Sequence, residues 1–178
     1  SYVHRIMYLA NKINYECLVA CAFLSSRTQH PTKQDMLKLN RVLQYLKGNS
    51  NLNITLTIDN NLQVNQYTDA SYGIHHDGKS HTGSCITLGR GAIHARSVKQ
   101  KIVTKSSTEA EIVGLSDEAS KGLWCIYFLK HQGYQNLPPL VEYQDNLSTI
   151  VMSKKGYTNA QRTRHIKVRY FWIKDYMD

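Results

Sequence analysis

The sequence lacks the features that most directly indicate a secreted or membrane protein. Its four cysteines include no Cys-x-x-Cys pair, which argues against a disulfide framework and a cysteine-based metal site. No apolar run reaches the length of a membrane-spanning helix, and no signal peptide is visible. We therefore expect an intracellular protein with reduced cysteines, no membrane partner and no small-molecule cofactor.

Acidic residues are absent from two long stretches of the chain. The formal net charge is +9 over 178 residues, although the 42% hydrophobic and 20% charged contents are typical of a globular protein. Such a surplus could serve solubility alone, but its clustering indicates a polyphosphate partner. The basic residues of the first stretch are Lys79, Arg90, Arg96, Lys99, Lys101 and Lys105; those of the second are Lys154, Lys155, Arg162, Arg164, Lys167, Arg169 and Lys174.

The hydrophobic periodicity alternates between helical and strand-like spacing along the chain. Helical spacing predicts two N-terminal helices, the second capped by Thr32 and ending near Gly48, and a long helix over 106–130. Alternating patterns predict strands between and after these helices. The predicted strands are 54–58, 62–68, 83–88, 92–97 and 140–144. The first N-terminal helix is predicted over 2–24, and two further helices are predicted at 147–153 and from about 165. This order predicts an α/β fold, a mixed sheet flanked by helices with a small helical N-terminal segment.

Three carboxylates occupy positions where strands and helices meet. Asp69 and Asp145 each end a predicted strand, and Glu111 lies in the first two turns of the long predicted helix. Any one of them alone would be a cap or a solvated carboxylate. Together they would repel one another unless a divalent cation neutralised them, and an all-oxygen donor set suits Mg²⁺ or Mn²⁺. Two such ions about 4 Å apart can hydrolyse a phosphodiester.

Several segments, in order, resemble copia-type retrotransposon Pol polyproteins. Tyr67-Thr68-Asp69-Ala70-Ser71 is similar to the opening strand of ribonuclease H domains, and the run from Lys99 to Glu111 (KQKIVTKSSTEAE) is the longest and most specific match. Later matching blocks are Tyr143-Gln144-Asp145-Asn146 and Arg162-Thr163-Arg164-His165-Ile166. The N-terminal blocks Met7-Tyr8-Leu9-Ala10 and 41–48 (RVLQYLKG) resemble the segment that joins the polymerase to its ribonuclease H.

This resemblance implies residues 1–60 as the tail of a reverse transcriptase and residues 61–178 as a ribonuclease H-like domain. It implies a ribonuclease H that hydrolyses the RNA strand of RNA–DNA hybrids with two Mg²⁺ or Mn²⁺ ions. Asp69, Glu111 and Asp145 would be the catalytic metal ligands. The partners would be the hybrid and the polymerase of the same polyprotein. The compartment would be the cytoplasm, in virus-like particles, or the nucleus.

Two points about the acidic residues stay open in the sequence. Ser106 with Glu109 fits a capping box, but so does Thr108 with Glu111, so capping cannot separate the two glutamates; the family pattern favours Glu111. The family also uses a fourth carboxylate, in an Ala-Asp pair beyond the Arg-Thr-Arg-His-Ile block. We expect that Asp, with the final strand and helix, to lie beyond Asp178. The alternative function is accordingly a truncated or domesticated, non-catalytic remnant that binds nucleic acid or packs on the polymerase.

The remaining polar and aromatic residues are interpreted more simply. The histidines 75, 76 and 81 are expected in a solvated or hybrid-contacting loop rather than a metal site, and His165 either contacts substrate or caps the last helix. Trp124, Tyr127 and Phe128 are expected in the core rather than as a base-stacking platform. The predicted nucleic-acid contacts, chiefly to phosphates, are Arg90, Arg96, Lys99, Lys101, Arg162, Arg164 and His165. An integrase of the same fold is disfavoured because its Glu follows the second Asp.

Overall fold

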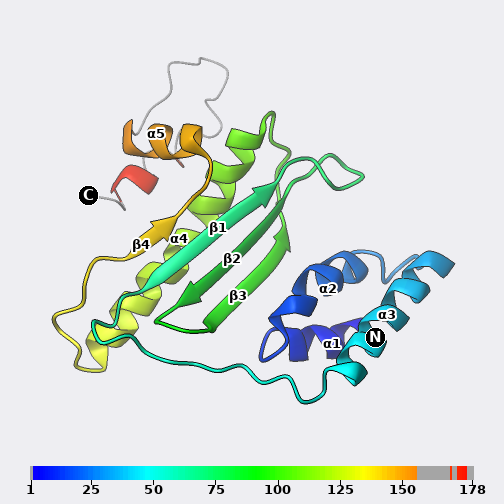
Figure 1. Cartoon of the computed structure of the whole chain (residues 1–178). Helices are drawn as coiled ribbons and strands as arrows, with labels where there is room; N and C mark the ends of the chain where they lie inside the picture. Colours follow the sequence, from blue (N-terminus) through cyan, green and yellow to red (C-terminus); the bar gives the residue numbers. More distant parts are fainter. Residues whose placement is uncertain (1, 156–168, 170–171, 176–178) are drawn as a thin grey trace.

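The computed structural model describes residues 2–155, 169 and 172–175. Four strands form one mixed sheet (Figure 1). Three α-helices precede the sheet in the sequence, and a long helix packs on one of its faces. The elements in chain order are α1 (Tyr2–Ala10), the 3-10 turn η1 (Tyr15–Cys17), α2 (Leu18–Ser25), α3 (Lys33–Gly48), β1 (Asn65–Ser71), β2 (His81–Thr87), β3 (Ala92–Lys99), α4 (Ser107–His131), β4 (Val141–Tyr143) and α5 (Leu147–Lys155).

The sheet has the strand order β3-β2-β1-β4. The three strands β1, β2 and β3 form an antiparallel meander, whereas β4 returns beside β1 in the parallel direction after α4. A parallel neighbour requires a crossover connection, and α4 supplies it. The predicted mixed α/β sheet with flanking helices is therefore confirmed.

The helix α4 packs along the sheet and buries one face of β1. Strand alternation places Gln66, Thr68 and Ala70 on that face, and each is less than 8% exposed. Helical spacing predicts an apolar stripe on α4, of which Ile112, Leu115, Ala119 and Ile126 are buried and Leu123 is half-buried. The main cluster between helix and sheet consists of Val64, Ile86, Leu88, Cys125, Ile126 and Leu129. Burial of this stripe against the sheet is the principal source of the helix's stability.

One expectation about α4 is wrong. Trp124, Tyr127 and Phe128 were expected in the core, but they are 64%, 56% and 47% exposed. The helix contacts the sheet through a single stripe, and these three residues lie on the opposite side of the helix from Cys125, Ile126 and Leu129. Their hydrophobicity alone predicted burial that the geometry of a one-sided contact does not supply.

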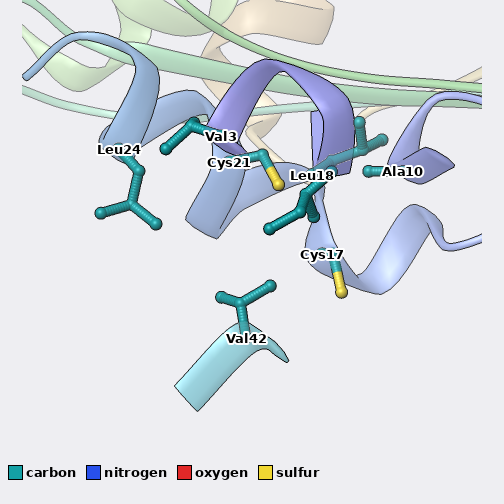
Figure 2. Close-up of a cluster of buried hydrophobic side chains, with 8 residues drawn as sticks. Val3, Ala10, Cys17, Leu18, Cys21, Leu24 and Val42 are labelled. Carbon is teal, nitrogen blue, oxygen red and sulfur yellow. The ribbon is translucent and has the colours of Figure 1, made fainter. Parts of the chain in front are cut away.

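The N-terminal helices form a separate apolar cluster (Figure 2). The predicted single helix over 2–24 is in fact broken between Ala10 and Tyr15, where the side chain of Asn11 donates to the Met7 carbonyl at 2.8 Å and competes with helix continuation. The helix α3 begins as predicted at Thr32, whose side chain and that of Asp35 form a reciprocal capping box. The buried members of the cluster are Val3, Ile6, Ala10, Cys17, Leu18, Cys21, Leu24 and Val42.

The predicted strand 54–58 is also wrong. This segment passes the β2–β3 hairpin instead of joining the sheet: the Thr57 N–H donates to the Arg90 carbonyl at 2.9 Å and the Asp59 N–H to the Leu88 carbonyl at 2.9 Å. Ile58 is 63% exposed. Its alternating pattern was real, but the segment lies against a turn, and Ile54 and Leu56 are exposed as well.

Most of the predicted last helix from His165 lies outside the described residues, although 169 and 172–175 are helical. Ile173 is buried against Ile112 and Leu115 of α4. No helix in the described part of the chain is long and apolar enough to cross a membrane.

Candidate active site

The parallel pairing of β1 and β4 brings the two aspartates to the same end of the sheet. Tyr67 and Tyr143 are partners in the register, and their rings stack with centroids 4.5 Å apart. Asp69 and Asp145 each follow two residues later, and both side chains are exposed. Because parallel strands run in the same direction, equal offsets from a register pair place both carboxylates at equivalent positions.

The third carboxylate comes from the start of α4. The hydroxyl of Ser106 accepts from the Glu109 N–H at 3.2 Å, and the Glu109 carboxylate accepts from the Lys105 N–H at 2.7 Å. Glu109 therefore stabilises the helix N-terminus. Glu111, half a turn further, faces β1 instead and is 5% exposed. The structure thus separates the two glutamates that capping chemistry left open.

Asp69, Glu111 and Asp145 form one acidic cluster, which we call the carboxylate triad. One oxygen from each lies within 4.8 Å of the others. Burial, together with the charges of Asp69 and Asp145, raises the pKa of Glu111 to about 7, although hydrogen bonds from Gln144 and the Ala70 backbone oppose this rise. The triad thus concentrates acidic groups at this end of the sheet, with Asp69 and Asp145 exposed and Glu111 buried.

Gln144 holds the triad together, a role that the sequence interpretation did not assign. Its side-chain amide donates to the Glu111 carboxylate at 3.2 Å, and its carbonyl oxygen accepts from the Asn146 N–H at 2.9 Å. Asn146 in turn caps α5 by accepting from the Thr149 N–H at 3.0 Å. The signal was available, because Gln144 and Asn146 flank Asp145 within the Tyr-Gln-Asp-Asn block.

The triad's chemistry fits a hard divalent cation. All of its donors are carboxylate oxygens, with no His or Cys, which suits Mg²⁺ or Mn²⁺ rather than Zn²⁺. Three clustered carboxylates gain from a cation that offsets their mutual repulsion. Two of the three are exposed, which leaves room for a substrate and water.

A trough of about 710 Å³ lies along the open face of the sheet, opposite α4, and ends at the triad. Its floor includes Tyr67 and Tyr143, and one wall is built by Tyr15 and Phe23 of the N-terminal helices. The Tyr15 hydroxyl also donates to the Ile93 carbonyl of β3 at 3.4 Å. The N-terminal segment therefore shapes the approach to the acidic cluster.

The predicted basic contacts are dispersed over the described part of the structure. Lys99 ends β3 beside His81 and Ser71, at the triad's end of the sheet, and pairs with Asp77 at 2.8 Å; the exposed Lys101 follows it. Arg90 lies at the tip of the β2–β3 hairpin, next to the start of β1 and thus at the other end of the sheet. Arg162, Arg164 and His165 lie outside the described residues.

Arg96 is not a free cation. Its guanidinium pairs with Glu118 of α4, which is 1% exposed and also accepts from the Ser84 hydroxyl at 2.8 Å. Glu118 lies seven residues after Glu111 and so on the same helix face. The expectation of a phosphate contact at Arg96 thus meets a competing structural role that its sequence position did not reveal.

A further carboxylate, that of the half-buried Glu142, lies on the face of the sheet that α4 covers. Its Oε1 accepts from the Thr68 hydroxyl at 2.7 Å, so β4 is tied to β1 one residue before Asp69. Burial, together with the charge of Glu118, raises the pKa of Glu142 to about 8, although the hydrogen bond from Thr68 opposes this rise. Period-two alternation would have placed Glu142 on the inner face, but its polarity argued against that position.

The histidines 75, 76 and 81 do not share one loop, because His81 is the first residue of β2. The His75 Nε2 and His81 Nδ1 atoms are 3.0 Å apart, and the His81 Nε2 lies 2.7 Å from the Ser97 hydroxyl oxygen. The ring of Phe23 of α2 stacks on both imidazoles. His81 is 6% exposed, and burial lowers its pKa to about 4. The expectation of a solvated loop is therefore wrong for His81, whose neutral ring joins the sheet to the N-terminal helices, while the alternative of a hybrid contact stays a prediction.

A mixed sheet with an acidic triad at the ends of two parallel strands, completed by a glutamate from the crossover helix, defines a ribonuclease H-like α/β protein. Comparisons with known proteins place it further. The chain is 33% identical over 153 residues, 85% of its length, to the retrovirus-related Pol polyprotein from transposon RE1 of Arabidopsis thaliana. It is 31% identical over 179 aligned residues, its whole length, to that from transposon TNT 1-94 of Nicotiana tabacum.

The chain belongs to the copia-type retrotransposon Pol polyproteins, of which it corresponds to one region. It spans only 10% and 13% of the lengths of the two relatives described above. A shorter relative, the secreted RxLR effector protein 161 of Plasmopara viticola, is 30% identical over 125 residues, which are 70% of this chain and 88% of that protein. No protein-family model matches the chain.

Proposed function

We propose that this region acts as a ribonuclease H, which hydrolyses the RNA strand of an RNA–DNA hybrid during reverse transcription. The observation that carries the proposal is the carboxylate triad: Asp69, Glu111 and Asp145 converge from three separate segments onto one point at the sheet end. Convergence of like charges costs free energy in the folded state, so it indicates a functional rather than a structural arrangement. Membership of the Pol polyproteins supports the choice of a nucleic-acid substrate.

The exposed and the buried members of the triad would have different roles. Asp69 and Asp145 face the solvent and can bind cations that also contact a phosphodiester, while the buried Glu111 fixes the inner side of the site. Bound Mg²⁺ or Mn²⁺ would activate a water molecule and stabilise the leaving oxygen of the phosphodiester. Gln144 orients the Glu111 carboxylate, and the Thr68–Glu142 hydrogen bond holds β1 and β4 in register.

The surroundings of the triad suit a polynucleotide backbone. Lys99 and Lys101 lie at the same sheet end and could attract phosphates on one side. The trough beside the triad provides a concave surface that Tyr67 and Tyr143 line. Recognition of a hybrid by its shape and its 2′-hydroxyls requires no base-specific contacts.

We further propose that residues 1–60 form the end of the polymerase part and 61–178 the nuclease part of the polyprotein. In support, the buried residues of the N-terminal cluster all precede residue 60, and those of the two other clusters all follow it. The polymerase of the same polyprotein would then be the natural partner of this region.

The direct test is a cleavage assay with a hybrid labelled on its RNA strand, in Mg²⁺ or Mn²⁺. The full chain should cut the RNA strand, and Asp69→Asn should slow cleavage by about a hundredfold or more, because metal catalysis supplies several kcal/mol. Asp59→Asn is the matched control, since Asp59 is exposed, lies outside the triad and contacts the β2–β3 hairpin at the other end of the sheet. Absence of metal-dependent cleavage, or cleavage that survives Asp69→Asn, would overturn the proposal.

A second candidate function is binding without cleavage. The similarity to the RxLR effector protein 161, a short protein of which this chain covers 88%, favours it because that name denotes no nuclease. The same assay separates the two functions. A chain that binds the hybrid in a gel-shift experiment but leaves its RNA strand intact in both metals would support the second.

A further inference from the structure

The outer side of α4 exposes three large aromatic side chains. Trp124 is 64% exposed, Tyr127 56% and Phe128 47%. Single exposed apolar residues are common on protein surfaces, but a contiguous group of large aromatics usually marks a site of interaction. Nothing in the acidic cluster or its trough uses these side chains.

The spacing of these residues places them together along the helix. Positions 124, 127 and 128 follow the i, i+3, i+4 rule, and Lys121 and His131 extend the same side by three residues in each direction. The rings of Trp124 and Phe128 stack with centroids 5.3 Å apart and planes 17° apart. We call this surface the α4 ridge, defined by Lys121, Trp124, Tyr127, Phe128 and His131.

Basic residues predominate around the ridge. No acidic residue occurs in the sequence from Ala119 to Val141, and Lys121, Lys130 and His131 lie on exposed positions of the helix. The nearest acid on this side, Asp117, forms an ion pair with Arg169. Within the part of the chain that the structure describes, Lys121 and Lys130 form no ion pair, so the ridge offers aromatic faces next to free cations.

We propose that the α4 ridge binds single-stranded nucleic acid, with bases stacked on its aromatic rings and phosphates near Lys121 and Lys130. Exposed aromatics beside positive charge are the combination that binds single strands, because every base has a stacking face and every linkage a phosphate. A duplex hides these faces between its own base pairs. A protein partner fits less well, since lysine is depleted in protein–protein interfaces.

This site is separate from the carboxylate triad. Thirteen residues along α4 separate Glu111 from Trp124, which corresponds to about 20 Å, and the two side chains lie on different sides of the helix. Binding at the ridge therefore does not depend on the proposed nuclease activity. If both functions hold, the ridge would retain an unpaired stretch of a strand while the triad acts elsewhere on it.

The test measures binding of labelled oligo(dT) and oligo(U) to the full chain by fluorescence anisotropy, in EDTA so that no metal-dependent cleavage can occur. The double variant Trp124→Leu/Phe128→Leu should bind about tenfold or more weakly, given the cost of losing base–aromatic stacking. The control Tyr8→Leu removes an aromatic side chain of similar exposure, 66%, from α1 and should bind like the parent chain. Lys121→Gln/Lys130→Gln should weaken binding and reduce its salt dependence.

Photocrosslinking of a 5-bromouracil strand, mapped by mass spectrometry, should label residues within 121–131. Circular dichroism checks that each variant is folded, and Leu at both positions preserves helix propensity. Unchanged affinity in the Trp124/Phe128 double variant, or crosslinks confined to other segments, would overturn the proposal. So would a parent chain that self-associates through the ridge, detected by light scattering as an oligomer that this variant converts to a monomer.

Asp69→Asn provides the comparison with the proposed nuclease. It should abolish hybrid cleavage and leave single-strand affinity unchanged, so failure of one proposal can be recognised independently of the other.

Discussion

Tyr67 and Tyr143 are register partners in a parallel strand pair, and their stacked rings lie two residues before Asp69 and Asp145. The strand β4 has only three residues, so its pairing with β1 rests on few backbone hydrogen bonds. The aromatic stack on one face and the Thr68–Glu142 hydrogen bond on the other therefore help to keep the two aspartates at the same level.

The two glutamates at the start of α4 should respond differently to the same substitution. Glu111→Gln should weaken Mn²⁺ binding, measured by isothermal titration calorimetry, by at least the roughly 10- to 100-fold that follows loss of an outer-shell partner of a metal ligand. Glu109→Gln should retain Mn²⁺ affinity but lower the free energy of unfolding by about 1 kcal/mol, because it weakens the helix N-terminus. Equal metal affinities in the two variants would contradict this assignment.

Glu142 should make the stability of the protein depend on pH. Its pKa is raised from the ordinary 4.5 to about 8 in the folded state, so the folded chain binds a proton that the unfolded chain releases between these values. The stabilisation is complete below pH 4.5 and is lost as the pH rises through 8. Glu142→Gln imitates the protonated side chain, and its stability relative to the parent should therefore increase on the order of a few kcal/mol from pH 5 to pH 8.

Urea unfolding of Glu142→Gln and the parent at pH 5, 6.5 and 8 checks this prediction. The difference between the two proteins isolates Glu142 from other titrating groups, including its neighbour Glu118. A difference that stays constant over the three pH values would show that Glu142 has the same pKa folded and unfolded.

Arg96 should contribute to stability through Glu118. Arg96→Met should lower the free energy of unfolding by roughly 1–3 kcal/mol, since it leaves a carboxylate with 1% exposure without its cation. The double variant Arg96→Met/Glu118→Gln should recover part of this loss, as measured by urea unfolding. If Arg96→Met instead weakened hybrid binding with no loss of stability, the phosphate contact expected from the sequence would be its role.

The hairpin between β2 and β3 should tolerate no side chain at Gly91. This glycine has φ of +85°, and a Cβ there would lie 2.4 Å from the Thr55 carbonyl oxygen. Gly91→Ala should therefore lower the thermal unfolding midpoint, with a cost of about 1–3 kcal/mol or more. Gly48→Ala, with no atom within 4 Å of the added methyl group, should be neutral or slightly stabilising. Similar midpoints for both variants would argue against the close passage of segment 54–58.

The sequence by itself determined the elements with strong periodicity and clear ends. The helix α3 has its predicted cap, Thr32, and α4 begins directly after Ser106, one of its two candidate caps, because capping and an apolar stripe are local properties. Both aspartates were predicted at strand ends; Asp145 follows β4, whereas β1 continues to Ser71 and so contains Asp69. The resemblance to Pol polyproteins added Glu111, which no local rule distinguished from Glu109.

Only the tertiary structure decided which side chains meet. Burial depends on what packs opposite a residue, so Trp124 and Phe128 on the outer side of α4 are exposed although they are hydrophobic, and Glu118 beneath the sheet is buried although it is acidic. Arg96 is paired for the same reason, through a strand and a helix 22 residues apart in the chain. The choice of Glu111 for the triad likewise follows from the direction in which α4 packs on β1, since a change of two positions along a helix turns a side chain by about 200°.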